Sequence, residues 1–314
     1  MNLSQLEYII AVDNNRHFVK AAECCFVTQA TLSMMIKKLE DELDVKIFDR
    51  NKHPVIPTRE GEEILIRARK IVSEINGLGA YARELKEAIS GELLLGIIPT
   101  LAPYLLPLFL KNFALKYPNI KLRIKELVTT EIIVKLKNGG LDIGILATPL
   151  SDVGIEERPL FYEEFFAYVS KNEKLSAKKY LLPREIYLNN LWLLEEGHCL
   201  RNQVFNLCEL KKQDIASDNL HYEAGSIETL INLVDKSDGI TIVPHLAAKM
   251  LKPAQKIKLR EFANPKPVRE ISLVSSTHFP RKKLLDHLAA EIIKVVPPEM
   301  LSPAKKKIAS IINN

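Results

Sequence analysis

The chain has 314 residues, of which 47% are hydrophobic and 26% are charged, a composition that excludes disordered, collagen-like and low-complexity proteins. Its length suggests about two domains, at ~100–200 residues each. The apolar runs are far shorter than the ~20 residues that cross a membrane, and the first residues do not resemble a secretory signal. Four cysteines are too few for a disulfide scaffold in a chain this long. We therefore expect a cytoplasmic protein without a membrane partner.

The net charge of +5 is unevenly distributed, because residues 249–314 alone carry a net charge of +9. A basic segment of this kind is often taken as a nucleic-acid site. Phosphate contacts, however, depend on a few positioned cations rather than on the average charge of a segment. The lysines at 305–307 follow three nearby prolines, so we expect residues 301–314 to form a solvated basic tail.

Residues 1–60 are predicted to form short helices, because apolar residues recur at helical spacing in three stretches. The second stretch begins near Phe18, and Thr28 is typical of the N-cap of the third. The short linker between the second and third stretches fits a helix-turn-helix. An ordinary three-helix bundle with a polar face is the alternative at this point.

The third predicted helix presents side chains that suit DNA. Glutamine pairs well with adenine edges, and serine or threonine pairs with several bases. Lysine and arginine nearby would contact phosphates. The candidate DNA-binding residues are Thr28, Gln29, Thr31, Ser33, Lys37, Lys38 and Arg50.

The residue spacing over this segment resembles the winged helix-turn-helix of LysR-type transcriptional regulators. The resemblance rests on the runs 27–33, 47–50 and 57–61, which cover about 60 residues without a gap. It implies a domain that binds double-stranded DNA. Ala30 stands where the family usually has proline, and the adjacent methionines 34 and 35 replace residues that are often more polar, which bears on base preference.

A heptad stripe follows, because residues 62–89 lack proline and carry apolar or small residues at alternating intervals of four and three. The stripe consists of Ile64, Ala68, Ile71, Ile75, Leu78, Ala82, Leu85 and Ile89. One amphipathic helix lying on its own domain is an alternative. We favour a linker helix over residues 61–90 that forms a homodimer through residues 62–89, as the family resemblance also implies. Two recognition helices would then read half-sites ~10 bp apart.

Residues 91–300 alternate between strand-like and helical patterns, which predicts an α/β domain with a mostly parallel sheet. Strands are expected at 93–98, 120–128, 141–146, 165–170, 191–194, 239–243 and 271–275, and helices at 103–117, 129–138, 200–210, 227–235 and 281–295. The arrangement resembles the LysR-type effector domain, which is similar to periplasmic binding proteins. That resemblance implies one lobe over 91–161 with 267–300 and a second lobe over 162–266.

The cysteines form two pairs with different surroundings. Cys24 and Cys25 lie in a predicted helix and are interpreted as packed, inert thiols. Cys199 follows His198 where a strand becomes a helix, and both a helix N-terminus and a protonated histidine favour a thiolate. A thiolate can attack the O–O bond of a peroxide and become a sulfenic acid.

Cys208 lies nine residues beyond Cys199, which is about 13 Å along one helix at ~1.5 Å per residue. A disulfide needs Cα atoms within about 7 Å, so a bond between the two would require the helix to unwind. Two partly buried thiols without a redox role are the alternative from chemistry alone.

The runs 98–100, 103–107, 195–203, 227–230 and 239–244 resemble the peroxide-sensing members of the LysR family. The resemblance implies that Cys199 is the peroxidatic and Cys208 the resolving cysteine. It implies a homotetramer that binds DNA, responds to hydrogen peroxide and activates oxidative-stress genes, with RNA polymerase as a candidate partner. Residues implied to hold peroxide are Thr100, Thr129 and His198, with His221 and Arg269 around the effector cleft, whereas Glu223 and Ile231 replace basic residues.

Two further classes of function compete with a peroxide-responsive regulator. A LysR-type regulator could bind a small organic effector in the same cleft, with Thr100 and Thr129 holding a carboxylate. A thiol peroxidase could use Cys199 with His198. We expect no enzyme, no metal and no cofactor, because no metal-ligand cluster, glycine-rich phosphate loop or nucleophile elbow is found in the sequence.

Overall fold

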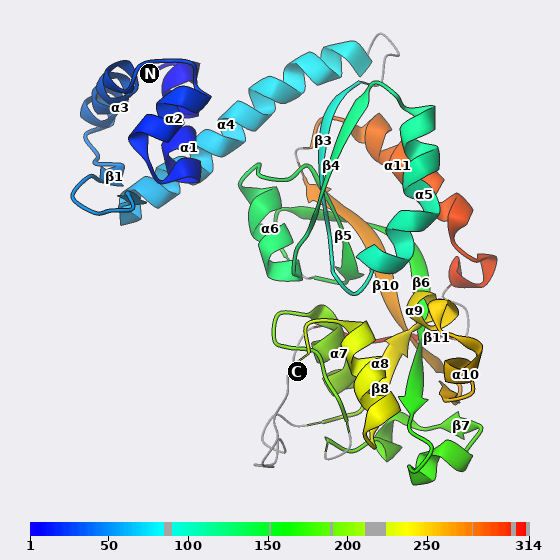
Figure 1. Cartoon of the computed structure of the whole chain (residues 1–314). Helices are drawn as coiled ribbons and strands as arrows, with labels where there is room; N and C mark the ends of the chain where they lie inside the picture. The colour runs from blue at the N-terminus through cyan, green and yellow to red at the C-terminus, as the bar shows by residue number, and fades with distance from the viewer. Residues whose placement is uncertain are drawn as a thin grey trace. The chain divides into compact units, whose positions relative to one another are not determined.

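A computed structural model describes residues 1–84, 90–150, 152–188, 191–210, 224–277, 279–302 and 306–311. The chain divides into two compact units (Figure 1). One consists of Met1–Ala88 with Lys137–Gly140, and the other of Ile89–Leu136 with Leu141–Asn314. Within the described residues, every helix is too short or too polar to span a bilayer.

The N-terminal unit is a winged helix-turn-helix, which confirms the predicted fold of this part. Its elements are α1 (Leu3–Asn15), α2 (Phe18–Cys24), α3 (Gln29–Leu43), the hairpin β1 (Phe48–Asp49) and β2 (Ile56–Pro57), and α4 (Arg59–Glu84). As predicted, Thr28 caps α3, since its Oγ1 accepts a hydrogen bond from the Thr31 backbone N–H at 3.2 Å. The buried faces of α1 and α3 contribute Ile9 and Ile36 to one hydrophobic core, and both are fully buried.

Glu40 of α3 joins the wing to the helices. Its carboxylate is buried, and Oε1 accepts a hydrogen bond from the Ile47 backbone N–H at 2.8 Å. Oε2 forms an ion pair with Arg50 at 3.0 Å, and the Arg50 guanidinium lies over the Phe18 ring. A buried carboxylate with this many partners fixes the wing relative to α3.

The long helix α4 leaves part of the heptad stripe uncovered. Ala68 is buried, whereas Ile71, Ile75 and Leu78 are 42%, 45% and 68% exposed within a single chain. Such a stripe requires a partner, so pairing of two chains through this helix stays a prediction. Leu85 and Ile89 lie outside the described residues.

The second unit is built on a mixed sheet, so the expectation of a mostly parallel sheet is wrong. Its first lobe has parallel strands β4 (Ile120–Glu126), β3 (Gly91–Ile97) and β5 (Ile143–Thr148), packed by α5 (Ala102–Lys116), α6 (Thr129–Lys137) and α11 (Lys282–Val295). Strands β6 (Ile155–Val169) and β10 (Lys266–Ser276) join antiparallel. They run in opposite directions because the chain leaves this lobe along β6 and returns along β10.

The second lobe grows on the far half of β6, where Phe165–Val169 pair with β8 (Ile240–Pro244). Its other elements are β7 (Tyr180–Leu181), β9 (Leu259–Phe262), α7 (Cys199–Leu207), α8 (Ile227–Lys236), α9 (His245–Met250) and α10 (Pro253–Lys256), with short 3-10 helices Lys174–Ala177, Pro183–Glu185 and, after α11, Pro298–Met300. The strand expected at 191–194 is reduced to isolated bridges at Leu191 and Leu194. The two-lobed α/β architecture is confirmed.

The C-terminal residues differ from the expected solvated tail. Lys306–Ile308 form a strand, β11, that pairs in parallel with β10. Ala309 is 6% exposed, and its backbone N–H donates to the Val268 carbonyl at 2.7 Å. Backbone pairing and burial therefore outweigh the charge of the lysines in this segment.

The start of α4 passes so close to the wing that only glycine fits at position 61. A Cβ on Gly61 would lie 2.1 Å from the Ile47 carbonyl oxygen, which is backbone. We expect Gly61→Ala to lower the free energy of unfolding of the N-terminal unit by about 2–4 kcal/mol, as overpacking against backbone does. Urea unfolding measures this. The exposed neighbour Glu62 supplies the control. If Glu62→Ala lowered the free energy of unfolding as much as Gly61→Ala, the steric account would be contradicted.

Candidate redox site on α7

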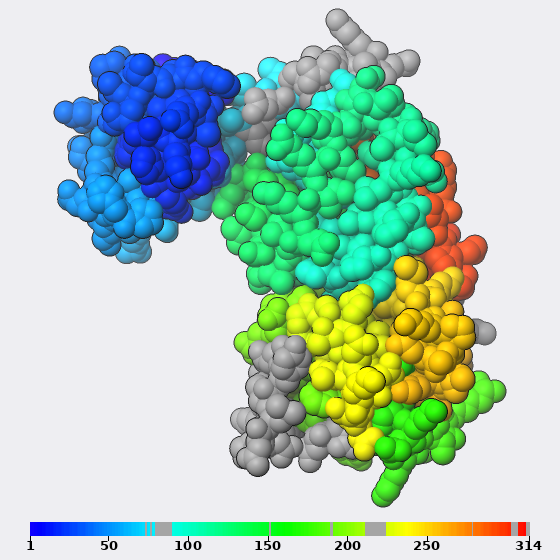
Figure 2. All heavy atoms as spheres, viewed as in Figure 1, coloured from blue at the N-terminus to red at the C-terminus, as the bar shows by residue number. Residues whose placement is uncertain are grey.

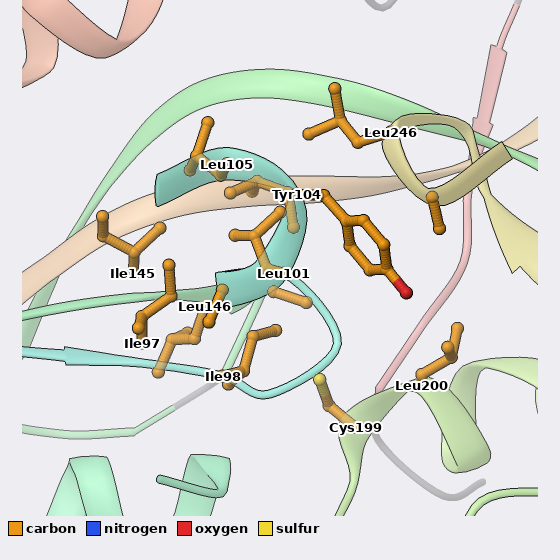
Figure 3. Close-up of a cluster of buried hydrophobic side chains, with 14 of the residues drawn as sticks. Ile97, Ile98, Leu101, Tyr104, Leu105, Ile145, Leu146, Cys199, Leu200 and Leu246 are labelled. Carbon is orange, nitrogen blue, oxygen red and sulfur yellow. The ribbon is translucent and has the colours of Figure 1, made fainter. Parts of the chain in front are cut away.

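Cys199 is the first residue of α7 and is 4% exposed. Figure 3 shows its sulfur directed toward the loop that carries Ile98 and Leu101 in the other lobe. The free N–H groups at the start of a helix carry a partial positive charge, which stabilises an anion at this position. The Cys199 sulfur therefore lies at a helix N-terminus and is shielded from bulk water.

The turn before Cys199 is set by Gly197, whose φ of +96° lies in the region that other residues rarely adopt. A Cβ at Gly197 would lie 3.8 Å from a methyl of Val128. This contact places the turn against the segment that leads into α6, where Thr129 begins the helix. The site is thus assembled from loops of both lobes.

Three residues predicted to hold peroxide are buried on these loops. Thr129 is 7% exposed, and within the described residues its Oγ1 has no hydrogen-bond partner. An unsatisfied buried hydroxyl costs about 1–3 kcal/mol, so a small polar ligand or water is expected there. His198 occupies the N-cap of α7, with Nε2 3.5 Å from the Glu195 carboxylate. Thr100 is 3% exposed and lies in the loop that faces Cys199.

Thr100 is held by an ion pair that no sequence pattern indicated. Arg269 Nη1 donates to Thr100 Oγ1 at 3.0 Å, and Nη2 donates to the Thr100 carbonyl at 3.1 Å. Glu163, directly opposite Arg269 on β6, pairs with its guanidinium at 2.7 Å. Both side chains are fully buried, and Glu163 also accepts from the Leu246 backbone N–H at 2.7 Å. The pair therefore links the Thr100 loop to both lobes.

A second contact crosses the lobes beside the site. Tyr104 of α5 donates its hydroxyl hydrogen to Glu228 of α8 at 2.5 Å. Burial, followed by this hydrogen bond, raises the pKa of the Tyr104 hydroxyl above its usual range. The surfaces of α5 and α8 abut in Figure 2, and Tyr104 lies near Cys199 and Leu200 in Figure 3. Tyr104 and Glu228 therefore join α5 to α8 across the two lobes.

Cys208 follows the other end of α7 and is 4% exposed. Burial raises the pKa of its thiol to about 12, so in this conformation it is a thiol. All four cysteines are free. Because the nine residues from Cys199 to Cys208 are helical, they advance about 13 Å. The two sulfurs cannot bond while α7 is intact.

The remaining candidate residues differ in their exposure, and two of them are not described by the structure. Cys24 is exposed rather than packed, and Cys25 is half-buried, with a pKa raised mainly by burial. His221 and Glu223 lie outside the described residues, and Ile231 is buried in α8. Within the described ranges no three His, Cys, Asp or Glu side chains are grouped as a metal site would need.

Six of the candidate DNA-binding residues lie between the N-cap of α3 and Lys38, and the seventh, Arg50, follows β1 in the wing. Thr28, Gln29, Thr31, Lys37 and Lys38 are exposed. The other two candidates contact each other, since Arg50 Nη1 donates to Ser33 Oγ at 3.0 Å while Nη2 pairs with Glu40. Arg50, which follows β1 in the wing, is thus tied to α3, and its phosphate contact stays a prediction.

Comparison with known proteins identifies two matching family models and several similar proteins. The model of the bacterial regulatory helix-turn-helix protein, lysR family, matches residues 3–62, and that of the LysR substrate binding domain matches residues 86–296. A hydrogen peroxide-inducible genes activator of Dickeya chrysanthemi is 34% identical, covering 93% of this chain and 95% of the relative. The HTH-type transcriptional regulator EstR of Acinetobacter baylyi is 33% identical, covering 91% and 94%.

A similar fold is found in a solved full-length OxyR variant from Pseudomonas aeruginosa. The match has a TM-score of 0.79 and 32% identity, and it covers 94% of this chain and 99% of that one. The likeness therefore extends over both the N-terminal and the effector units.

The ion pair between Glu163 and Arg269 gives a stability prediction. Glu163→Gln leaves a buried arginine charge without its counter-ion, so we expect a loss of about 3–5 kcal/mol in the free energy of unfolding of the effector unit. Denaturant titration measures the loss. The adjacent Glu164, which pairs with the partly exposed Lys266, is the matched control, and Glu164→Gln should cost under about 1 kcal/mol. Equal losses in the two variants would refute the assignment.

Proposed function

The chain belongs to the LysR family of bacterial transcriptional regulators, and we propose that it is a peroxide-responsive activator switched by oxidation of Cys199. The observation that carries the proposal is the buried Cys199 at the start of α7, which faces a loop of the other lobe. The turn before it packs near Val128, and the next residue, Thr129, has a buried hydroxyl without a partner. Its relatives include hydrogen peroxide-inducible genes activators. Because it acts on DNA, its compartment is the cytoplasm.

The first step is a two-electron oxidation of the Cys199 sulfur. The thiolate attacks one oxygen of hydrogen peroxide, the O–O bond breaks, and the departing hydroxide takes a proton and leaves as water. Cys199 becomes a sulfenic acid. Thr100 and Thr129 would hold the peroxide oxygens through their hydroxyls, and His198 at the N-cap would supply the proton. No metal or cofactor is needed for this chemistry.

The second step joins the cysteines. The Cys208 thiolate attacks the sulfenic sulfur of Cys199, the S–O bond breaks, and the released hydroxide takes a proton to leave as water. Because α7 keeps the sulfurs apart, the disulfide forms only after the helix unwinds. The reduced and oxidised effector units therefore have different folds, which is what a switch requires.

The signal reaches DNA through assembly. Exposed positions of the stripe on α4 would pair two chains, so that two α3 helices read half-sites ~10 bp apart. A homotetramer would carry two such pairs, and the oxidised effector units would change their spacing and their contact with RNA polymerase. The protein would act by binding, so we assign it no enzymatic turnover. Sustained peroxide consumption with a thiol donor would contradict that assignment.

A second candidate function is regulation by a small organic effector. The observation in its favour is that EstR, which is not named for peroxide, is nearly as similar as the peroxide-inducible activators. The Thr100 and Thr129 hydroxyls could then hold a carboxylate. Thermal-shift screening separates the two, because a specific metabolite that stabilises the protein without thiol oxidation would favour this second function.

Cys199→Ser tests the proposed switch. Serine cannot form a sulfenic acid, so we expect the variant to bind operator DNA as the reduced protein does and to lose the peroxide response entirely. Footprinting with and without peroxide measures both properties. Cys24→Ser, which changes an exposed thiol, is the matched control and should respond normally. A normal response from Cys199→Ser would remove the basis of the proposal.

The pKa of Cys208 predicts how the second step depends on pH. Because burial raises this pKa from an ordinary value of 9.0 to about 12, the protonated thiol stabilises intact α7 below pH ~9, and this stabilisation is lost as pH rises toward 12. The attacking thiolate comes from the unwound state. Disulfide closure should therefore accelerate about ninefold from pH 7 to 8 and about fivefold from pH 8 to 9, as the pH approaches the ordinary pKa of the thiol.

Stopped-flow oxidation followed by acid quench measures the closure rate. In Cys208→Ser the reaction should stop at the sulfenic acid at every pH, which isolates the first step. A closure rate that is constant from pH 7 to 9 would contradict the thiolate mechanism.

A further inference from the structure

The C-terminal residues 306–311 lie beyond residue 296, where the match to the family ends. They are nevertheless ordered against the second lobe. In Figure 3 the pale red C-terminal trace descends from its strand toward the helix that carries Leu200. They contact two elements, β10 and α7.

The first contact is with the part of the β10 edge that β5 does not cover. On this edge β5 pairs with Glu270–Ser275, and β5 ends at Thr148, opposite Glu270. Beyond that point β11 takes its place, pairing Lys306–Ile308 with Lys266–Val268. Without β11, the backbone groups of this edge would lack strand partners, which is the arrangement that binds an added strand. The start of β10 is therefore a strand-binding site, occupied by the chain's own C-terminus.

The second contact is with α7. Gln203 is fully buried, and its Nε2 donates to the Ala309 carbonyl at 3.3 Å. Asn206 Nδ2 donates to the Ser310 carbonyl at 2.9 Å. These residues are three apart, so they share one face of the helix. Both lie between Cys199 and Cys208, in the segment that the disulfide must unwind.

We propose that residues 306–311 form a strap that docks on β10 and α7 in the reduced protein and is released when the Cys199–Cys208 disulfide unwinds α7. The inference rests on the proposed function for its redox half, whereas the docking stands on the contacts alone. A segment that binds only the reduced fold stabilises that fold, and by linkage it opposes disulfide formation. The strap thus sets how much oxidant the switch requires.

Removal of the strap tests the linkage. A chain ending at Ser302 should form the disulfide with an equilibrium constant about tenfold larger in dithiothreitol redox buffers, which lowers the reduction potential by about 30 mV. Ala309→Pro removes the N–H that donates to Val268 and should act in the same direction. Lys307→Ala, the matched control, removes only an exposed side chain of the strap and should change nothing.

A double-mutant cycle separates the strap contact from general destabilisation. Gln203→Met should raise the equilibrium constant in the full chain and leave it unchanged in the chain that ends at Ser302. Equal effects of Gln203→Met in both backgrounds, or a potential unaffected by the truncation, would overturn the strap.

Release is measured by trypsin cleavage after Lys306 and Lys307, followed by mass spectrometry. Cleavage should be slow in the reduced protein and in peroxide-treated Cys199→Ser, and at least tenfold faster in the oxidised protein. Equal rates would overturn release. If no disulfide forms at all, the proposed function fails, and hydrogen exchange in the reduced protein still tests docking. Truncation should accelerate exchange of the α7 amides, and unchanged exchange would overturn the docking.

Discussion

The geometry of α7 is the constraint on which the proposed switch depends. A nine-residue helix places one cysteine at each end, and helical rise keeps them about 13 Å apart. The helix and the disulfide therefore exclude each other. Neither cysteine alone would create a switch. Cys199 at the N-terminus gains the field of the helix, whereas Cys208 at the C-terminus is kept protonated by burial. The same helix directs Cys199 toward the opposite lobe and keeps Cys208 buried and protonated.

The rest of the effector unit holds this helix against the opposite lobe. The buried pair of Glu163 and Arg269 ties the Thr100 loop to the two long strands that cross between the lobes. Tyr104 and Glu228 add a hydrogen bond that joins α5 to α8. Buried ion pairs contribute little net stability but penalise rearrangement, because each charge without its partner is costly. A rigid platform of this kind would confine the proposed conformational change to α7 and the residues that contact it.

Local patterns explain which parts of the fold could be predicted from the sequence. Thr28 was identified as an N-cap, and the α7 segment as a helix beginning near Cys199, because caps and helical periodicity are properties of neighbouring residues. The pair of Glu163 and Arg269 could not be found in this way, since it depends on the register of strands more than a hundred residues apart. The strand β11 could not be predicted either. Its lysines indicate a solvated tail, but the segment pairs with an edge of β10, a strand distant in the sequence. The sequence therefore indicates which residue types form the candidate site. It does not indicate that Arg269, paired with Glu163, positions Thr100.

Peptide-mapped mass spectrometry after a brief, near-stoichiometric dose of peroxide, with free thiols blocked, tests the central claim most directly. The account predicts a loss of two hydrogens and a crosslink between the peptides of Cys199 and Cys208, with Cys24 and Cys25 still free. Four unmodified thiols after the same dose would contradict it.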